Sequence, residues 1–167
     1  MRTTDTHVYF YGSTPFSNWH DSRRQFTYKG QWFDNSEQAF MWEKALFFND
    51  AETAEMILLK PDPKETKALG RQVKNFDKVK WDEVCLEIMI SVLISKFAQN
   101  DDFKKLLLDT GERTLVEASP YDKIWGIGLH WSDDAVLDEK NWQGKNLLGN
   151  ALMKVRSGLV NNYSVLP

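Results

Sequence analysis

Glu37 and Lys44 are the two side chains whose types and spacing are best suited to chemistry. They lie seven residues apart in the segment DNSEQAFMWEKA. At about 100° per residue, seven steps along an α-helix return to within roughly 20° of the starting direction, so both residues share one helix face. Phe40, Met41 and Phe48 occupy the same stripe, and this pattern predicts a buried face. The pair is separated by about 10 Å of axial rise, which leaves room for a ligand.

An acid and an amine on an apolar stripe have two interpretations. In a desolvated cleft, burial lowers the pKa of a lysine and raises that of a glutamate. A neutral lysine is then a nucleophile toward a masked aldehyde. Alternatively, Asp34 caps a helix that runs to about Asn49, Glu37 completes the capping box, and Lys44 extends its amine to solvent from a buried stem. The sequence alone leaves both interpretations open.

The segment VEASPYDKIWGIGL gathers further candidates close together. Asp122 and Glu117 are possible general acids or bases if they are partly buried, or caps of the next element. Trp125 offers a flat face to a planar ligand, although a core position is the more common role for a tryptophan. Gly126 and Gly128 let the backbone approach a ligand, or simply form a tight turn.

Five other residues have side chains that suit hydroxyl or phosphate groups. Ser17 and Asn18 lie in the turn TPFSNW, which they would equally serve to close. Asn146 precedes a predicted helix whose first amides are a possible phosphate cradle, although a plain N-cap accounts for the same residue. Arg71 and Arg156 are phosphate candidates of low specificity, since most arginines lie solvated on the surface.

The composition predicts one compact domain spanning residues 1–167. Hydrophobic residues make up 42% and charged residues 27% of the chain, close to the average for globular proteins. The formal net charge of -3 provides no general attraction to nucleic acid or to an anionic membrane. No segment reaches the roughly 18 to 20 apolar residues that a membrane span needs, so we expect a cytoplasmic protein that does not associate with a membrane. We also expect no obligate protein partner.

The cysteine and histidine content bears on redox compartment and on metals. Cys85 is the single cysteine and lies in the apolar run EVCLEIMISVLI, so it cannot form an internal disulfide. We expect it to pack in the core in a reducing compartment. The three histidines are isolated, and no metal-ligand spacing appears. We therefore expect no metal and no cofactor.

The hydrophobic periodicity predicts an α+β fold that is mostly helical, with a small β-sheet. HVYFYG is typical of a strand, and RRQFTYKGQWFD of a hairpin that turns at Lys29-Gly30. Apolar residues cover most of the circumference of the helix predicted over 79–100, which indicates a central buried helix. The remaining expected elements are helices over 34–49, 50–60, 63–73, 101–111 and 146–160 and a strand over 113–119.

Six blocks of the sequence, taken in order, resemble the NADAR family. They are YGSTPFSNW, SEQAFMWEKA, KALGRQV, KFAQN, LLDTGERTLVEASPYDKIWGIGL and WQGKNLLGNALMKVR. The resemblance extends from about Tyr9 to Leu159. The family commonly has Glu-His at the start of the first of these helices, and this chain has Glu37-Gln38 there, so any role of that imidazole is absent.

The resemblance implies an N-glycosidase. Members include enzymes that act on ribosylamino-pyrimidine intermediates of riboflavin synthesis, and ADP-ribose attached to guanine in nucleic acid is a second substrate class. It also implies that Glu37, Lys44, Asp122 and Trp125 line the active site, and that Lys44 attacks the anomeric carbon of the opened ribose to form a Schiff base. The alternative is a non-catalytic module that binds ADP-ribose or a nucleotide. A purely structural protein is a third hypothesis.

Overall fold

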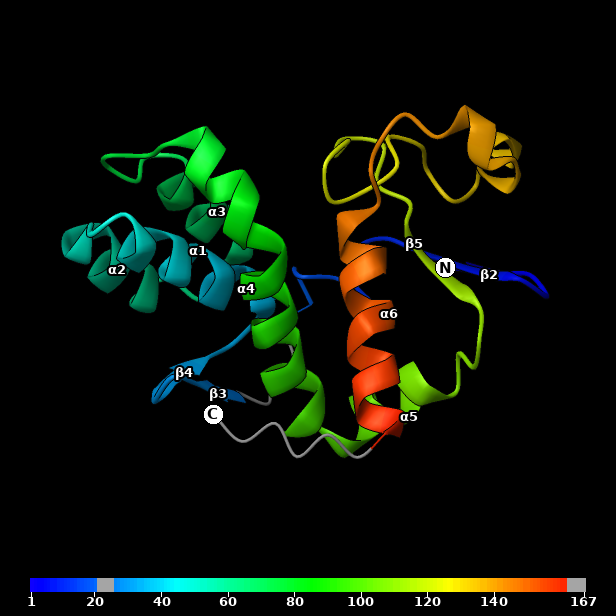
Figure 1. Ribbon diagram of the computed structural model, residues 1–167, viewed down its shortest axis with the longest axis horizontal. Helices are drawn as coiled ribbons and strands as arrows, with labels where there is room; N and C mark the ends of the chain where they lie inside the picture. The colour runs from blue at the N-terminus through cyan, green and yellow to red at the C-terminus, as the bar shows by residue number, and fades with distance from the viewer. Residues whose placement is uncertain (21–25, 162–167) are drawn as a thin grey trace. The chain divides into compact units, whose positions relative to one another are not determined.

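The computed structural model describes residues 1–20 and 26–161 (Figure 1). The α+β fold class that the sequence predicts is confirmed. The chain forms two compact units, which are described in turn. Among the described residues, those from 18 to 100 form one unit, and residues 1–17 together with residues 101–161 form the other.

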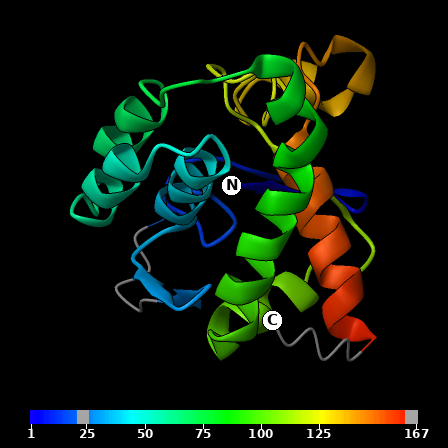
Figure 2. The same ribbon diagram turned by 60° about the vertical axis from the view of Figure 1, so that its left-hand side comes forward.

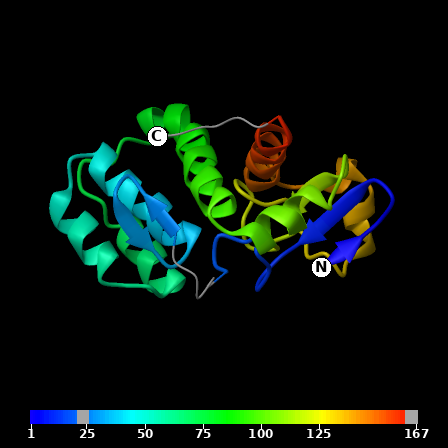
Figure 3. The same cartoon turned by 90° about the horizontal axis from the view of Figure 1, so that it is seen from below.

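The unit of residues 18–100 begins with the predicted hairpin (Figure 3). Strands β3 (Phe26–Tyr28) and β4 (Gln31–Phe33) pair antiparallel. Lys29 and Gly30 have φ values of 47° and 78°, which a two-residue turn matched to the strand twist requires. The predicted turn is therefore confirmed, whereas residues 23–25 of the predicted hairpin lie outside the described residues.

Four helices complete this unit. They are α1 (Ser36–Phe47), α2 (Ala51–Leu58), α3 (Pro63–Gly70) and α4 (Lys78–Ala98). Helix α1 packs against each of the other three, and Figure 2 shows it beside α2 and α3. Because α1 is surrounded in this way, the side chains along it meet protein on several sides.

Helix α4 is buried along one stripe of residues. The buried part of its surface is therefore smaller than its sequence predicts. Its other positions are half-buried or exposed, and Val79 and Glu87 are among the exposed ones. Cys85 lies in the stripe, as expected, and burial raises the pKa of its thiol. The buried residues are Trp81, Cys85, Met89, Val92, Leu93, Lys96 and Phe97.

The cap of α1 differs from the predicted one. Asn35, rather than Asp34, is the N-cap, and its side chain accepts a hydrogen bond from the Gln38 amide at 2.9 Å. The Gln38 side chain accepts in turn from the Asp34 amide at 3.1 Å. Since the helix begins one residue later than expected, Gln38 takes the N3 position. The predicted capping box of Asp34 and Glu37 is therefore wrong.

The other unit is built on a three-stranded sheet in the order β1-β2-β5. Strands β1 (Arg2–Thr3) and β2 (His7–Phe10) pair antiparallel, and β5 (Thr114–Glu117) pairs parallel with β2. Helix α6 (Leu147–Val160) packs against β5, and α5 (Asp101–Leu108) packs against α6. A buried cluster supports the sheet and comprises Tyr9, Val116, Ala118, Ile127 and Val136.

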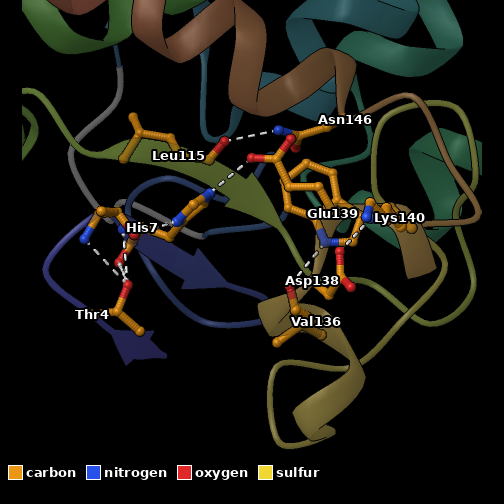
Figure 4. A network of polar contacts seen from close by, with 10 residues as sticks. Thr4, His7, Leu115, Val136, Asp138, Glu139, Lys140 and Asn146 are labelled. Carbon is orange, nitrogen blue, oxygen red and sulfur yellow. Dashed lines mark hydrogen bonds and ion pairs between the residues drawn. The ribbon is translucent and has the colours of Figure 1, made fainter.

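Two short 3-10 helices, η1 (Asp134–Leu137) and η2 (Glu139–Asn141), close this core. Figure 4 shows the polar contacts that attach them. His7 Nε2 lies 3.1 Å from Glu139 Oε1, and the Trp142 indole donates to the Val136 carbonyl at 2.9 Å. The first contact joins η2 to β2 and the second joins the end of η2 to η1, so we regard the network as structural. None of the described helices is both long and apolar enough to cross a membrane.

Candidate active site

The first turn of α1 is polar and yet buried. Glu37 is 5% exposed, and Ser36 and Gln38 are buried beside it. The Gln38 amide group donates to the carbonyls of Ile57 and Lys60 at the end of α2. The Glu37 backbone amide donates to the Asn18 carbonyl at 3.0 Å. Thus the side chains of Asn35 and Gln38 form the cap of α1.

Lys44 is held by the fold two turns further along α1. Its Nζ donates to the Gly70 carbonyl at 2.8 Å, and it lies 4.2 Å from the ring centre of Phe76 and 5.8 Å from that of Trp81. Burial lowers the pKa of the Lys44 amine, and the charge of Glu37 acts in the opposite direction. The amine therefore does not extend into open solvent. Its uncharged fraction at neutral pH is larger than that of a lysine exposed to water.

The end of α3 forms the support of this amine. A Cβ atom at Gly70 would lie 2.0 Å from Met41 Sδ, so a side chain at this position would require the Met41 side chain to move. The packing of α3 against α1 brings the Gly70 carbonyl to Lys44. Arg71 follows immediately as an exposed C-cap residue, which leaves a guanidinium one residue from the carbonyl that holds the amine.

Asn18 and Ser17 are both buried. The Ser17 amide closes the predicted turn by donating to the Thr14 carbonyl at 2.9 Å. Within the described residues, Asn18 Oδ1 is buried without a hydrogen-bond partner, which is uncommon in folded proteins. Since the Asn18 backbone is tied to Glu37, this oxygen is a candidate acceptor for a substrate hydroxyl near the same helix end.

Asp122 and Trp125 lie in a tight loop of the other unit. Asp122 Oδ1 accepts hydrogen bonds from the amides of Ile124 and Trp125 at 2.9 and 2.8 Å, so its carboxylate caps this turn. Trp125 itself is half-buried. A Cβ at Gly126 would lie 2.9 Å from two backbone oxygens, and Gly128 has a φ of 73°. The two glycines therefore form a tight turn, which is one of the two roles that the sequence left open for them.

Asn146 and Arg156 are both engaged by the protein itself. Asn146 has a left-handed backbone and no side-chain cap bond, and its amide group instead pairs with the backbone of Glu117 and Leu115 in β5. Arg156 Nη1 donates to Thr110 Oγ1 and to the Arg113 carbonyl. Ten residues along α6 separate the two by about 15 Å, so they do not form one phosphate site.

The structure therefore groups the candidates in two sets. Glu37, Lys44, Asn18 and Arg71 belong to the unit of residues 18–100. The other unit contains Ser17 and Arg156 and the loop set of Asp122, Trp125, Gly126, Gly128 and Asn146, in which the Asn146 amide donates to the Gly126 carbonyl. Among residues 1–20 and 26–161, no cluster of three His, Cys, Asp or Glu side chains is arranged to hold a metal.

Two residues that contact α1 were not identified from the sequence. One lies beside the polar first turn of the helix, and the other lies beside the Lys44 amine. Lys96 on α4 is 0% exposed, and its Nζ lies 3.4 Å from Ser36 Oγ. Burial lowers the pKa of Lys96 to about 7. Its position on the apolar stripe with Met89 and Val92 was a usable signal, the same one that identified Lys44. Phe76 gave no signal, because its contact with Lys44 joins residues 32 positions apart.

Comparison with known proteins places the chain in a family. The family model of the NADAR domain matches residues 9–160, which include parts of both units. N-glycosidase R617 of Acanthamoeba polyphaga mimivirus is 40% identical over 163 residues, covering 92% of this chain and 96% of that protein. Protein irg-1 of Caenorhabditis elegans is 43% identical over 129 residues, covering 76% of this chain and 61% of that protein.

A solved structure has the same fold. The NMR structure of the E. coli protein YbiA matches with a TM-score of 0.77 and 27% identity, covering 99% of this chain and 92% of that one. The chain therefore belongs to the NADAR family, as its sequence blocks predicted. Relatives over most of its length are N-glycosidases, and the protein is an enzyme of this N-glycosyl hydrolase class.

Proposed function

We propose that this protein hydrolyses the N-glycosidic bond between a base, or an amino-pyrimidine, and a ribose phosphate or ADP-ribose, through a Schiff base on Lys44. The observation that carries the proposal is the held and partly desolvated amine of Lys44 on the same helix as the buried Glu37. An uncharged lysine is a nucleophile toward the carbon of an aldehyde or an oxocarbenium-like sugar. The family membership supports the same class of reaction.

The proposed reaction begins with loss of the base. One carboxyl group protonates the departing nitrogen while positive charge develops on the ribose, and the negative charge of the other stabilises that sugar. Glu37 lies in the first turn of α1, where the helix dipole favours a negative charge, so we assign the stabilising role to Glu37. Asp122 is assigned as the second carboxyl group by family resemblance alone.

Lys44 then bonds to C1 of the ribose. Its lone pair attacks C1, a proton leaves the nitrogen, and opening of the sugar ring gives an imine between Nζ and C1. A water molecule adds to that carbon, and collapse of the adduct releases ribose product and returns the amine. Asn18, Ser17, Arg71, Trp125, Gly126 and Gly128 are proposed substrate contacts. Since Asn146 and Arg156 are engaged by the protein, we leave them out of the mechanism.

A side-by-side assay tests this function. The purified protein is incubated with a ribosylamino-pyrimidine phosphate and, separately, with an oligonucleotide that carries ADP-ribosyl-guanine, and released base is measured. We expect release from one of them, and borohydride added during turnover to leave a reduced sugar adduct on Lys44, identified by peptide mass spectrometry. Lys44→Ala should lose the adduct and lower kcat by at least about 10³-fold, as removal of catalytic nucleophiles does.

Lys64→Ala is the matched control, because Lys64 is an exposed lysine on the neighbouring helix α3. It should retain adduct and turnover. Full turnover in both Lys44→Ala and Glu37→Gln would contradict the mechanism. Calorimetric binding of ADP-ribose without release of base from either substrate would instead favour the non-catalytic binding module.

A further inference from the structure

Three groups enclose the Lys44 amine, and they differ in their exposure to solvent. The Gly70 carbonyl belongs to the end of α3, and the Trp81 ring belongs to the first turn of α4. Trp81 is 8% exposed and packs against Phe40, with 5.2 Å between ring centres, so it is a fixed part of the core. Phe76 is 46% exposed. Its ring is therefore the outer wall of the enclosure.

Phe76 is also the aromatic side chain closest to the amine. Its ring centre lies 4.2 Å from Nζ, compared with 5.8 Å for Trp81. Phe76 belongs to the connection between α3 and α4, and its ring rests edge-on against Phe48 with 5.3 Å between centres. This support from α1 fixes the ring over Lys44, even though almost half of Phe76 remains in contact with water.

An aromatic ring beside an amine has two opposing effects. Its π face attracts an ammonium ion, which favours the charged form. Its bulk excludes water, which favours the neutral form. Burial is the largest influence on Lys44 and lowers the pKa of its amine. Because the Phe76 ring lies directly over this amine, we expect its exclusion of water to outweigh the attraction of its π face.

We propose that Phe76 is a positioning residue that covers the Lys44 amine, keeps water from it, and so maintains the uncharged form that attacks a sugar carbon. The proposal deepens the proposed function and rests on it for the role of Lys44 as the nucleophile. The cover itself is a property of the protein without substrate, so it can be measured independently of turnover.

The other charged groups around Lys44 do not account for the lowered pKa of its amine. Glu37 on α1 favours the ammonium. From the 71–77 segment, Lys74 pairs with Glu52 at 2.6 Å, and Asp77 accepts from the first amides of α4.

The remaining cations at the end of α3 and at the start of α4 either contact other groups or are exposed to solvent. The amine of Lys67 lies over the Trp19 ring, and Arg71 is exposed. Lys78 and Lys80 pair with Asp82 and Asp77. Apolar cover is therefore the influence that a substitution of Phe76 should change.

The test measures how readily Lys44 reacts with acetic anhydride as pH varies, in the full-length protein without substrate. Peptide mass spectrometry gives the midpoint pH at which Lys44 becomes reactive. In Phe76→Ala we expect this midpoint to rise toward the ordinary lysine pKa of 10.5. In Phe76→Leu it should stay at or below the wild-type midpoint, because leucine keeps apolar bulk and lacks the π face that attracts the ammonium.

Trp32→Ala is the matched control, since Trp32 is a 62% exposed aromatic residue in the hairpin of the same unit. It should leave the Lys44 midpoint unchanged. An unchanged midpoint in Phe76→Ala would overturn the proposal, and so would an equal rise in Phe76→Leu or in Trp32→Ala. Urea unfolding of each variant verifies that the fold is retained.

Turnover supplies a second readout. Where the midpoint lies above about pH 8, each pH unit by which it rises lowers the uncharged fraction of Lys44 at pH 7 about tenfold, and kcat should fall by the same factor. The kcat of Phe76→Ala should recover toward the wild-type value at high pH, which a purely structural defect would not do. Absence of the borohydride adduct in the wild-type protein would count against the proposed function, whereas the midpoints would still decide the role of Phe76.

Discussion

Lys96→Met should stabilise the protein by an amount that depends strongly on pH. Lys96 is fully buried on α4, and burial lowers the pKa of its amine to about 7, compared with an ordinary value of 10.5. The unfolded chain therefore binds more protons than the folded one between these two values. It follows that this lysine lowers the free energy of unfolding below pH 10.5, and that the loss reaches its full size below pH 7.

The magnitude follows from the two pKa values. The difference between these two pKa values corresponds to about 5 kcal/mol. For one group titrating with these values, the cost is about 4 kcal/mol at about pH 7.5 and about 1 kcal/mol at about pH 9.5. Methionine has a similar length and no charge, so the stability advantage of the variant should shrink by about 2 to 3 kcal/mol across this interval.

Urea unfolding of the wild-type protein and of Lys96→Met at about pH 7.5 and about pH 9.5 measures this change, because the difference in unfolding free energy is obtained at each pH. Lys80→Met is the matched control, since Lys80 is an exposed lysine on the same helix. Its stability difference from wild type should be nearly independent of pH. A pH-independent difference for Lys96→Met would show that the buried amine keeps an ordinary pKa in the folded protein and would refute the reasoning.

Two further predictions concern stability. Asn35→Ala should lower the unfolding free energy by about 2 kcal/mol in urea titrations, because it removes the cap of α1 and the 2.7 Å hydrogen bond to the Pro61 carbonyl; equal stability would show that another group caps the helix. Gly149→Ala should destabilise by about 1 to 3 kcal/mol, because its Cβ would lie 2.0 Å from the Leu115 carbonyl oxygen. In Gly158→Ala on the same helix, the added Cβ would meet open space, so this variant should stabilise the protein by up to about 1 kcal/mol. If the urea midpoint of Gly149→Ala were higher than that of Gly158→Ala, the close packing of α6 on β5 would be contradicted.

The sequence identified the α-helices and the strands β2 to β5 because their signals are local, and it did not identify β1 or the two 3-10 helices. Gly30 favours the hairpin turn because glycine readily adopts the positive φ that the turn requires, and Pro63 marks the first turn of α3. The seven-residue spacing placed Glu37 and Lys44 on one helix. Each of these signals involves residues within two helical turns of one another. The cap of α1 was misplaced by one residue, because Asp34 and Asn35 are both good caps and only the packed helix start chose between them.

Only the tertiary structure decided what surrounds those residues. The periodic pattern shows which face of a helix is apolar, but it does not show which carbonyl or ring that face meets. Lys44 meets Gly70 and Phe76 because α3 approaches α1 closely, and Asn146 bonds to β5 across about 30 residues of sequence. Reactivity depends on exclusion of water from a single nitrogen atom, and water is excluded by neighbours that the folded chain brings together from distant positions.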